Sequence, residues 1–218
     1  MNGFPLLTTA LLLPIVGAVV VAVLPKGGRA ALPKQVALAF SLLTLVVVAV
    51  VGFGFDPGKS GFQFAEDHDW IRAFGAHYAV GVDGIGLTLV LLTAILSPVV
   101  ILASWNDGED GRWGINAFFA WMLALEGLAI GVFAATDVFL FYVLFEATLI
   151  PIYFLIGGFG GPRRSYAAVK FLLFSLLSSV RRYVGPVGEP DDTTYRPTTE
   201  ASISRPPSSE NSRNFTAA

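Results

Sequence analysis

Two glutamates stand inside long apolar stretches of the sequence, where an ionisable group could carry protons. Glu146 lies near the middle of "FLFYVLFEATLIPIYFLIGGFGG", which covers residues 139–161. Glu126 lies in the preceding apolar stretch, before the turn "AATD" at 134–137. Each glutamate is about nine residues from this turn, which at about 1.5 Å per residue of helix corresponds to a depth of about 13 Å. The sequence therefore predicts two carboxyl groups at one depth on neighbouring helices.

A carboxyl group at this depth lies near the midplane of a hydrocarbon core about 30 Å thick. A charged residue at the centre of a transmembrane helix costs about 2.5 to 3.5 kcal/mol on insertion scales, and packing, a partner charge or water must offset this cost. Buried carboxyls also exchange protons closer to neutral pH than exposed ones do. Glu146 and Glu126 are therefore candidates for a proton relay. The alternative for both is a protonated glutamate that only joins helices by a hydrogen bond.

Pro151 favours the relay role for Glu146. A proline in a helix lacks its own N–H and clashes with the carbonyl four residues earlier, here that of Ala147. A kink and a free carbonyl then arise beside the glutamate, where they can hold water or a partner helix. Alternatively, Pro151 is one of the prolines that transmembrane helices tolerate, as Pro14 and Pro98 would be.

Three further ionisable residues are weaker candidates. Lys170 lies about a turn inside the last apolar segment, so a relay role competes with simple extension of its amine to the membrane interface. His68 and His77 share one polar loop, and their spacing fits neither a helical metal pair nor a zinc signature, so we expect solvated loop residues.

The "GGFGG" run at 157–161 follows an apolar helix rather than a strand, which indicates a helix C-terminal cap and not a dinucleotide loop.

The composition places these residues in a membrane. The chain of 218 residues is 54% hydrophobic and 14% charged, with a mean hydropathy of +0.67. Soluble domains are about 45–50% apolar and about 25% charged. The net charge of -2 argues against a nucleic-acid partner. The apolar composition makes the lipid bilayer an expected partner, and the two glutamates make protons another. Because the chain has no cysteine, iron–sulfur or thiol redox chemistry would have to occur in another chain.

The predicted fold class is all-α, a polytopic transmembrane helix bundle over residues 1–180. Spanning a bilayer takes about 20 apolar residues. A sixth apolar segment begins at about Tyr166 and is cut short at Arg181. The first segment lacks a basic n-region and an A-x-A site, so we interpret it as a span and not a cleaved signal. The five predicted full spans are Phe4–Leu24, Lys34–Phe53, Ile85–Ser104, Ile115–Ala134 and Val138–Gly158.

Lysine and arginine in the short loops predict the orientation, because such residues favour the cytoplasmic side. The first loop and the fifth loop are basic, and the long loop at 56–83 is rich in Asp and Glu. We therefore expect the long loop and the N-terminus to face outside. The third loop then falls inside with a single arginine to support it. The basic residues of these loops are Lys26, Arg29 and Lys34, then Arg112, then Arg163 and Arg164.

Residues 181–218 differ in character from the rest. They are rich in Pro, Ser, Thr, Arg and acidic residues and have no apolar periodicity, so they cannot bury enough surface to offset their ordering entropy. We predict a disordered polar tail. The abrupt change also suggests that the tail is out of frame and that the natural protein continues the sixth helix. Sequencing the gene through the codons for Ser178 to Arg182 tests this hypothesis, which fails if no one-base shift restores an apolar helix.

Three stretches resemble one membrane family. They are "YAVGVDGIGLTLVLLTAILSPVVILASW" (78–105), "GVFAATDVFLFYVLFEATLIPIYFLIGGFGG" (131–161) and "AAVKFLLFS" (167–175). Together they resemble subunit M of proton-pumping NADH:quinone oxidoreductase, respiratory complex I, whose mitochondrial counterpart is chain 4. The resemblance covers about residues 1–179. It implies the N-terminal portion of an antiporter-like helical bundle with two inverted repeats. The glutamate of the family's F-E-x-x-L-I-P motif, an essential proton-channel residue, corresponds to Glu146, and the lysine of A-A-x-K-F corresponds to Lys170.

The resemblance implies a membrane-arm translocase subunit that couples electron transfer from NADH to quinone with proton pumping. It also implies the bacterial inner membrane as location and other complex I membrane subunits as partners. NADH, FMN, iron–sulfur clusters and quinone would sit in those partner subunits, and no cofactor or metal is expected in this chain.

The chain departs from the family pattern in one way. The helix-seven lysine that pairs with the glutamate, the broken helices and the second inverted repeat are absent, so this polypeptide as written is not expected to pump by itself. Two alternatives stay open: a subunit of a multisubunit Na⁺/H⁺ antiporter or membrane-bound hydrogenase, which share the glutamate, and a non-transporting scaffold. The Y-x-V-G-V-D-G-I stretch favours the M-type subunit.

Overall fold

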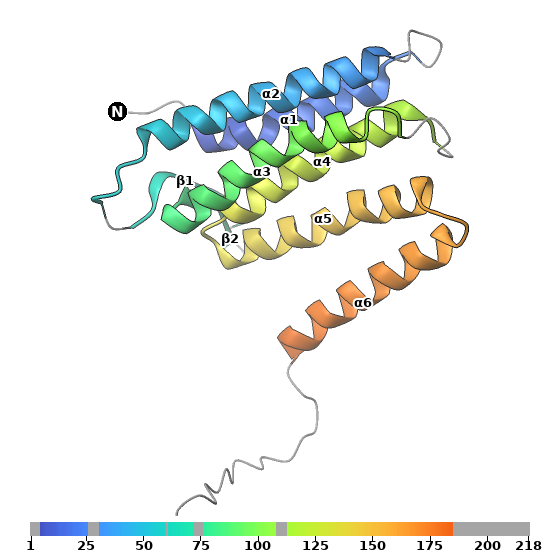
Figure 1. The fold of residues 1–218 in the computed structure, drawn as a ribbon. Helices are drawn as coiled ribbons and strands as arrows, with labels where there is room; N and C mark the ends of the chain where they lie inside the picture. Colours follow the sequence, from blue (N-terminus) through green and yellow to red (C-terminus); the bar gives the residue numbers. More distant parts are fainter. Residues whose placement is uncertain (1–4, 26–30, 60, 72–75, 108–112, 185–218) are drawn as a thin grey trace, which may run out of the picture. The chain divides into compact units, whose positions relative to one another are not determined.

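A computed structural model describes residues 5–25, 31–59, 61–71, 76–107 and 113–184. In chain order its elements are α1 (Leu6–Val23), α2 (Ala31–Gly54), β1 (Gln63–Ile71), β2 (Ala76–Val82), α3 (Gly84–Ala103), α4 (Ile115–Ala134), α5 (Val138–Phe159) and α6 (Arg164–Val184), as Figure 1 shows. Within the described ranges, α1 to α5 are long and apolar enough to cross a membrane. The predicted all-α transmembrane bundle is confirmed.

Helix α6 continues to Val184, past the predicted end of the sixth apolar segment at Arg181. Residues 185–218 lie outside the described residues, so the predicted disorder and the out-of-frame hypothesis stay predictions. The described residues up to Ser179 form one compact unit.

The helices form because hydrocarbon offers no water to backbone N–H and C=O groups, which must then pair within each segment. Two aspartates set where helices begin. Asp83 Oδ1 accepts a hydrogen bond from the Gly86 N–H at 2.7 Å at the start of α3. Asp137 Oδ1 accepts one from the Leu140 N–H at 2.8 Å at the start of α5. These carboxylates also lie where the helix dipole favours negative charge.

Helix α4 is the centre of the bundle, since it packs against α1, α2, α3 and α5. Two glycines bring α1 close to it. A Cβ at Gly127 would lie 2.7 Å from Ile15 Cγ1 and 2.8 Å from the Leu11 carbonyl oxygen. A Cβ at Gly131 would lie 2.6 Å from Leu11 Cδ1. The two positions are four apart in sequence, the spacing of small residues that lets transmembrane helices approach closely.

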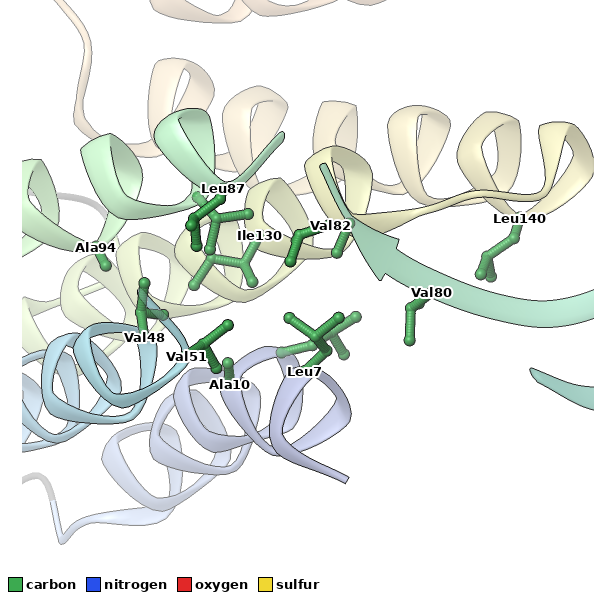
Figure 2. Close-up of a cluster of buried hydrophobic side chains, with 13 residues drawn as sticks. Leu7, Ala10, Val48, Val51, Val80, Val82, Leu87, Ala94, Ile130 and Leu140 are labelled. Atoms are coloured by element: carbon green, nitrogen blue, oxygen red, sulfur yellow. The ribbon is translucent and has the colours of Figure 1, made fainter. Parts of the chain in front are cut away.

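The bundle has two apolar clusters, one toward each end. The hairpin-end cluster combines side chains of the helices and of β2, and Figure 2 shows them gathered together. It contains Leu7, Ala10, Leu11, Val48, Val51, Val80, Val82, Leu87, Val90, Ala94, Ile130, Ala134 and Leu140. The far-end cluster contains Ala18, Val21, Ala37, Ile101, Phe118, Phe119, Ala120 and Leu123.

The loop before α3 contains a β-hairpin that was not predicted from the sequence. Strands β1 and β2 pair antiparallel, with Asp67 opposite Ala79 and His68 opposite Tyr78. The hairpin also joins the turn between α4 and α5, because the Thr136 N–H donates to the Ala79 carbonyl at 3.0 Å. The location predicted for the histidines was therefore wrong: both lie on strands rather than in a loop.

The histidine side chains are at the surface of this hairpin. His68 is exposed and its ring stacks on Tyr78 with the ring centroids 6.5 Å apart. His77 Nδ1 lies 3.3 Å from Asp67 Oδ1. In the ranges that the structure describes, no cluster of three or more His, Cys, Asp or Glu side chains could hold a metal ion.

A hydrogen-bonded cluster fastens the hairpin to the start of α1. The residue before α1, Pro5, offers no side-chain cap. Glu66 Oε1 of β1 instead accepts from the Leu7 N–H at 3.2 Å, and Thr8 Oγ1 donates to Glu66 Oε2. Thr8 Oγ1 also lies 2.8 Å from the Tyr78 hydroxyl. Because Thr8 has one hydroxyl proton and gives it to Glu66, the Tyr78 hydroxyl donates to Thr8.

The Tyr78 hydroxyl should make the stability of the folded protein decrease at alkaline pH. Burial raises the pKa of Tyr78 above its usual value of about 10, and the negative charge of Glu66 raises it further. A raised folded-state pKa means that this contribution to stability is complete below about pH 10 and is lost as pH rises through the raised value.

We expect the thermal stability of the detergent-solubilised protein to fall less above pH 10 in Tyr78→Phe than in the wild type. Thermal unfolding followed by circular dichroism measures this. Tyr166→Phe, which changes an exposed tyrosine of α6, is the matched control and should fall as the wild type does. An equal fall in Tyr78→Phe and wild type would contradict the assignment.

The close approach of α1 and α4 yields a second expectation. Gly127→Ala places a Cβ against backbone of α1, so it should destabilise the bundle by about 1–3 kcal/mol. This sign is opposite to the helix propensity of alanine, which alone would stabilise by up to about 1 kcal/mol. Thermal unfolding in detergent measures the difference. Gly84→Ala, where nothing lies within 4 Å of the added Cβ, is the control and should be neutral or slightly stabilising. A Gly127→Ala variant as stable as Gly84→Ala would refute the tight contact.

Candidate functional site: two carboxyl groups within the helix bundle

Glu126 is the more enclosed of the two carboxyl groups. It lies on α4 beside Gly127, and only 3% of its surface is exposed. Its Oε1 accepts a hydrogen bond from Ser41 Oγ of α2 at 3.5 Å. Its Oε2 is buried and has no hydrogen-bond partner. A buried oxygen without a partner is costly, so this position is set up for a proton or a donor that arrives from outside the bundle.

Glu126 belongs to a polar layer between the two apolar clusters. On α4 it stands between Leu123 of the far-end cluster and Ile130 of the hairpin-end cluster. Ser41 and Thr44 of α2 are fully buried at the corresponding place on their helix. Thr44 Oγ1 donates to the Phe40 carbonyl at 2.9 Å, so its hydroxyl proton is already used.

A groove of about 280 Å³ opens beside Glu126 between α3, α4 and α5. Most of its walls are apolar, and its polar lining residues are Glu126 and two hydroxyl residues of α3, Thr93 and Ser97. Ser97 Oγ donates to the Thr93 carbonyl at 2.9 Å, and Thr93 Oγ1 donates to the Leu89 carbonyl at 2.9 Å. Both hydroxyls therefore offer only lone pairs for further bonds.

Glu146 lies on α5, which packs against α4, and its side chain is half-buried. Its Oε1 is buried and lacks a hydrogen-bond partner. Pro151 is buried five residues further along the same helix. Between them, Thr148 Oγ1 donates to the Phe145 carbonyl at 2.6 Å. The helix thus carries a free carboxyl oxygen close to a proline that interrupts backbone pairing.

The structure places the two carboxyl groups on adjacent helices but in different surroundings. Glu126 contacts Ser41 of α2 and lines the groove next to α3. The unpartnered oxygens, Glu126 Oε2 and Glu146 Oε1, show that these two atoms are not hydrogen-bonded to each other. The equal depth inferred from residue counting stays a prediction.

Lys170 is exposed on α6. Its Nζ lies 5.8 Å from the ring centroid of Tyr166 and 5.7 Å from that of Phe174, which are cation–π contacts along its own helix. Among the described residues, no ion pair joins Lys170 to Glu126 or Glu146. The structure therefore does not bring the three candidate residues into one cluster.

Sequence reasoning missed two kinds of residue. Ser41 and Ser97, which provide hydroxyls around Glu126, are single serines in apolar helices and carry no motif of their own. Lys34, predicted at the boundary of the first loop and the second span, lies in the first turn of α2 and is only 5% exposed. Its Nζ stands 5.9 Å from the ring centroid of Trp105. Serine at the level of Glu126, counted along neighbouring helices, is the signal that could have identified the polar layer.

Fold and site together define a polytopic α-helical membrane protein with carboxyl groups inside its bundle. A family model described as "NADH:quinone oxidoreductase/Mrp antiporter, TM" matches residues 135–185, which include α5 and Glu146. NADH-quinone oxidoreductase subunit M of Mycobacterium tuberculosis is 43% identical over 215 residues, covering 86% of this chain and 39% of that protein. Subunit M of Rhodobacter capsulatus is 43% identical over 185 residues, covering 84% of this chain and 35% of that protein.

A solved structure agrees. Respiratory complex I from Thermus thermophilus with bound NADH contains a chain that matches with a TM-score of 0.68 and 26% identity, covering 82% of this chain and 34% of that one. The chain belongs to the family of subunit M, or chain 4, of NADH-quinone oxidoreductase, which confirms the resemblance. It spans about two fifths of the length of the Mycobacterium relative, 39%.

Proposed function

We propose that this chain acts as a proton-translocating membrane subunit of an NADH-quinone oxidoreductase. The observation that carries the proposal is Glu146: its carboxyl lies within a membrane-spanning helix, one oxygen is buried without a partner, and the residue lies in the segment that the family model matches. An intramembrane carboxyl of this kind marks a proton pathway by default.

The chain's own residues would handle protons and leave redox chemistry to other subunits. Glu146 takes up a proton on a free oxygen, and the Pro151 interruption leaves a backbone carbonyl that can hold a water next to it. Glu126 and Lys170 are further proposed relay residues. NADH, FMN, iron–sulfur clusters and quinone would bind partner subunits, because this chain has no cysteine with which to ligate a cluster. Other complex I membrane subunits are the proposed partners.

Location and orientation follow from the sequence argument. The proposed setting is the bacterial inner membrane, with the N-terminus and the hairpin outside. The connections on the opposite side, between α1 and α2 and between α5 and α6, carry the basic residues.

A second candidate function has its own support. The matching family model is described for both NADH:quinone oxidoreductases and Mrp antiporters, so a subunit of a multisubunit cation/proton antiporter is the alternative. The genes that neighbour this one would distinguish the two. Genes for redox subunits favour the oxidoreductase, and a cluster of antiporter genes without redox subunits favours the alternative.

We expect Glu146→Gln in the full-length subunit to abolish proton pumping, because an amide cannot take up and release a proton. Proton transfer by a positioned group contributes about 10²–10⁴-fold to rate, so the loss should be at least about a hundredfold. Glu146→Asp keeps the ionisable group and should retain part of the activity. The measurement is quenching of a pH-sensitive dye in membrane vesicles during NADH oxidation.

Asp107→Asn is the matched control for this experiment, because it removes an exposed carboxyl that follows α3. It should pump normally. Near-normal pumping by Glu146→Gln, with the complex assembled at normal levels, would overturn the proposal.

A further inference from the structure

The polar atoms around the groove are all hydrogen-bond acceptors. Glu126 Oε2 is buried without a hydrogen-bond partner. Glu126 lines the groove although only 3% of its surface is exposed. Ser97 and Thr93 have committed their hydroxyl protons to backbone carbonyls of α3. Ser41 has committed its proton to Glu126 Oε1. A site lined only by acceptors requires a donor or a cation to complete it.

A proton fits this site better than a metal cation does. Hard metal cations such as Ca²⁺ and Mg²⁺ take about six or more oxygen ligands. The groove presents three polar side chains among otherwise apolar residues. A single proton on Glu126 needs only one acceptor, which Ser97 Oγ or Thr93 Oγ1 can provide.

We infer that the groove between α3, α4 and α5 is a proton-binding site separate from Glu146, in which Glu126 carries the proton as a carboxylic acid and Ser97 Oγ accepts its hydrogen bond. This deepens the proposed function, on which any role in pumping rests, but the binding site itself depends only on this chain. The groove opens laterally, since Leu96 and Val100 on its wall are half exposed. An apolar reagent can therefore reach it from the lipid.

The surroundings of Glu126 contain few other titratable groups. Helices α1 and α3 carry no ionisable side chain. Helix α2 carries Lys34, two turns toward the far end, and α5 carries Glu146, Tyr142 and Tyr153. A pH-dependent signal at Glu126 therefore reports its own proton, with Glu146 as the other carboxyl to be distinguished.

Dicyclohexylcarbodiimide tests the inference because it reacts with protonated carboxyls in apolar surroundings. The acid O–H adds across one C=N bond of the reagent, and the adduct rearranges to an N-acylurea without a leaving group. The labelled peptide thus gains the whole mass of the reagent. We expect mass spectrometry of membranes that contain the full chain to find the adduct on the Glu126 peptide at pH 7, with a yield that falls at alkaline pH. Glu126→Gln should remove it, and Glu146→Gln should leave it unchanged.

Two serine and threonine variants test the geometry. Ser97→Ala removes the proposed acceptor and should lower the Glu126 adduct yield at pH 7 at least twofold. Thr88→Ala is the control, because its hydroxyl makes the same bond to the carbonyl four residues earlier, Gly84, at 2.8 Å, outside the groove. Equal yields in the two variants would overturn the role of Ser97.

Three other results would overturn the inference. Labelling of Glu126 at pH 5 but not at pH 7 would show an ionised carboxylate at neutral pH. Absence of the adduct at every pH would refute a protonated acid in a reachable groove. Protection by Na⁺ at constant pH would assign the site to a metal cation. None of these measurements requires pumping, so the test stands apart from that of Glu146.

Discussion

The central position of α4 is the constraint on which the bundle depends, and the close approach of α1 at Gly127 and Gly131 covers one side of this helix. Because these residues have no side chain, Leu11 and Ile15 of α1 lie directly against the α4 backbone. Helix α4 is then surrounded by α1, α2, α3 and α5. Glu126, adjacent to Gly127 in sequence, contacts Ser41 of α2 and lines the groove beside α3 and α5. In hydrocarbon such enclosure is required, since a carboxyl that faces lipid has no compensating hydrogen bond.

The same constraint explains why the two carboxyl groups differ. Helix α5 has neighbours on fewer sides than α4, since its packing is against α4 and the hairpin. Glu146 is accordingly half-buried, whereas Glu126 has a hydroxyl of α2 and a polar groove at its side. The polar layer between the two apolar clusters allows the Glu126 carboxyl to be buried inside the bundle. Glu146 on α5 stays partly exposed.

Much of this could be predicted from the sequence, for physical reasons that also explain the failures. The spans follow from length and hydropathy, and the position of Glu146 along α5 follows from its distance to the turn at Ala134–Asp137. The direction in which Glu126 faces depends on which helices surround α4. The spacing of Gly127 and Gly131 predicts a close helix contact but does not identify α1 as the helix that makes it. The hairpin was missed because its contact with α1, Glu66 to Leu7, joins residues far apart in sequence.

Infrared difference spectroscopy of the protein in lipid at neutral pH tests the central claim, that the bundle holds a proton on Glu126 independently of Glu146. We predict a C=O band of a protonated carboxyl that shifts in D₂O, disappears in Glu126→Gln and is unchanged in Glu146→Gln. A wild-type spectrum in which no protonated carboxyl is lost on Glu126→Gln, or a Glu126 band that moves when Glu146 is changed, would contradict it.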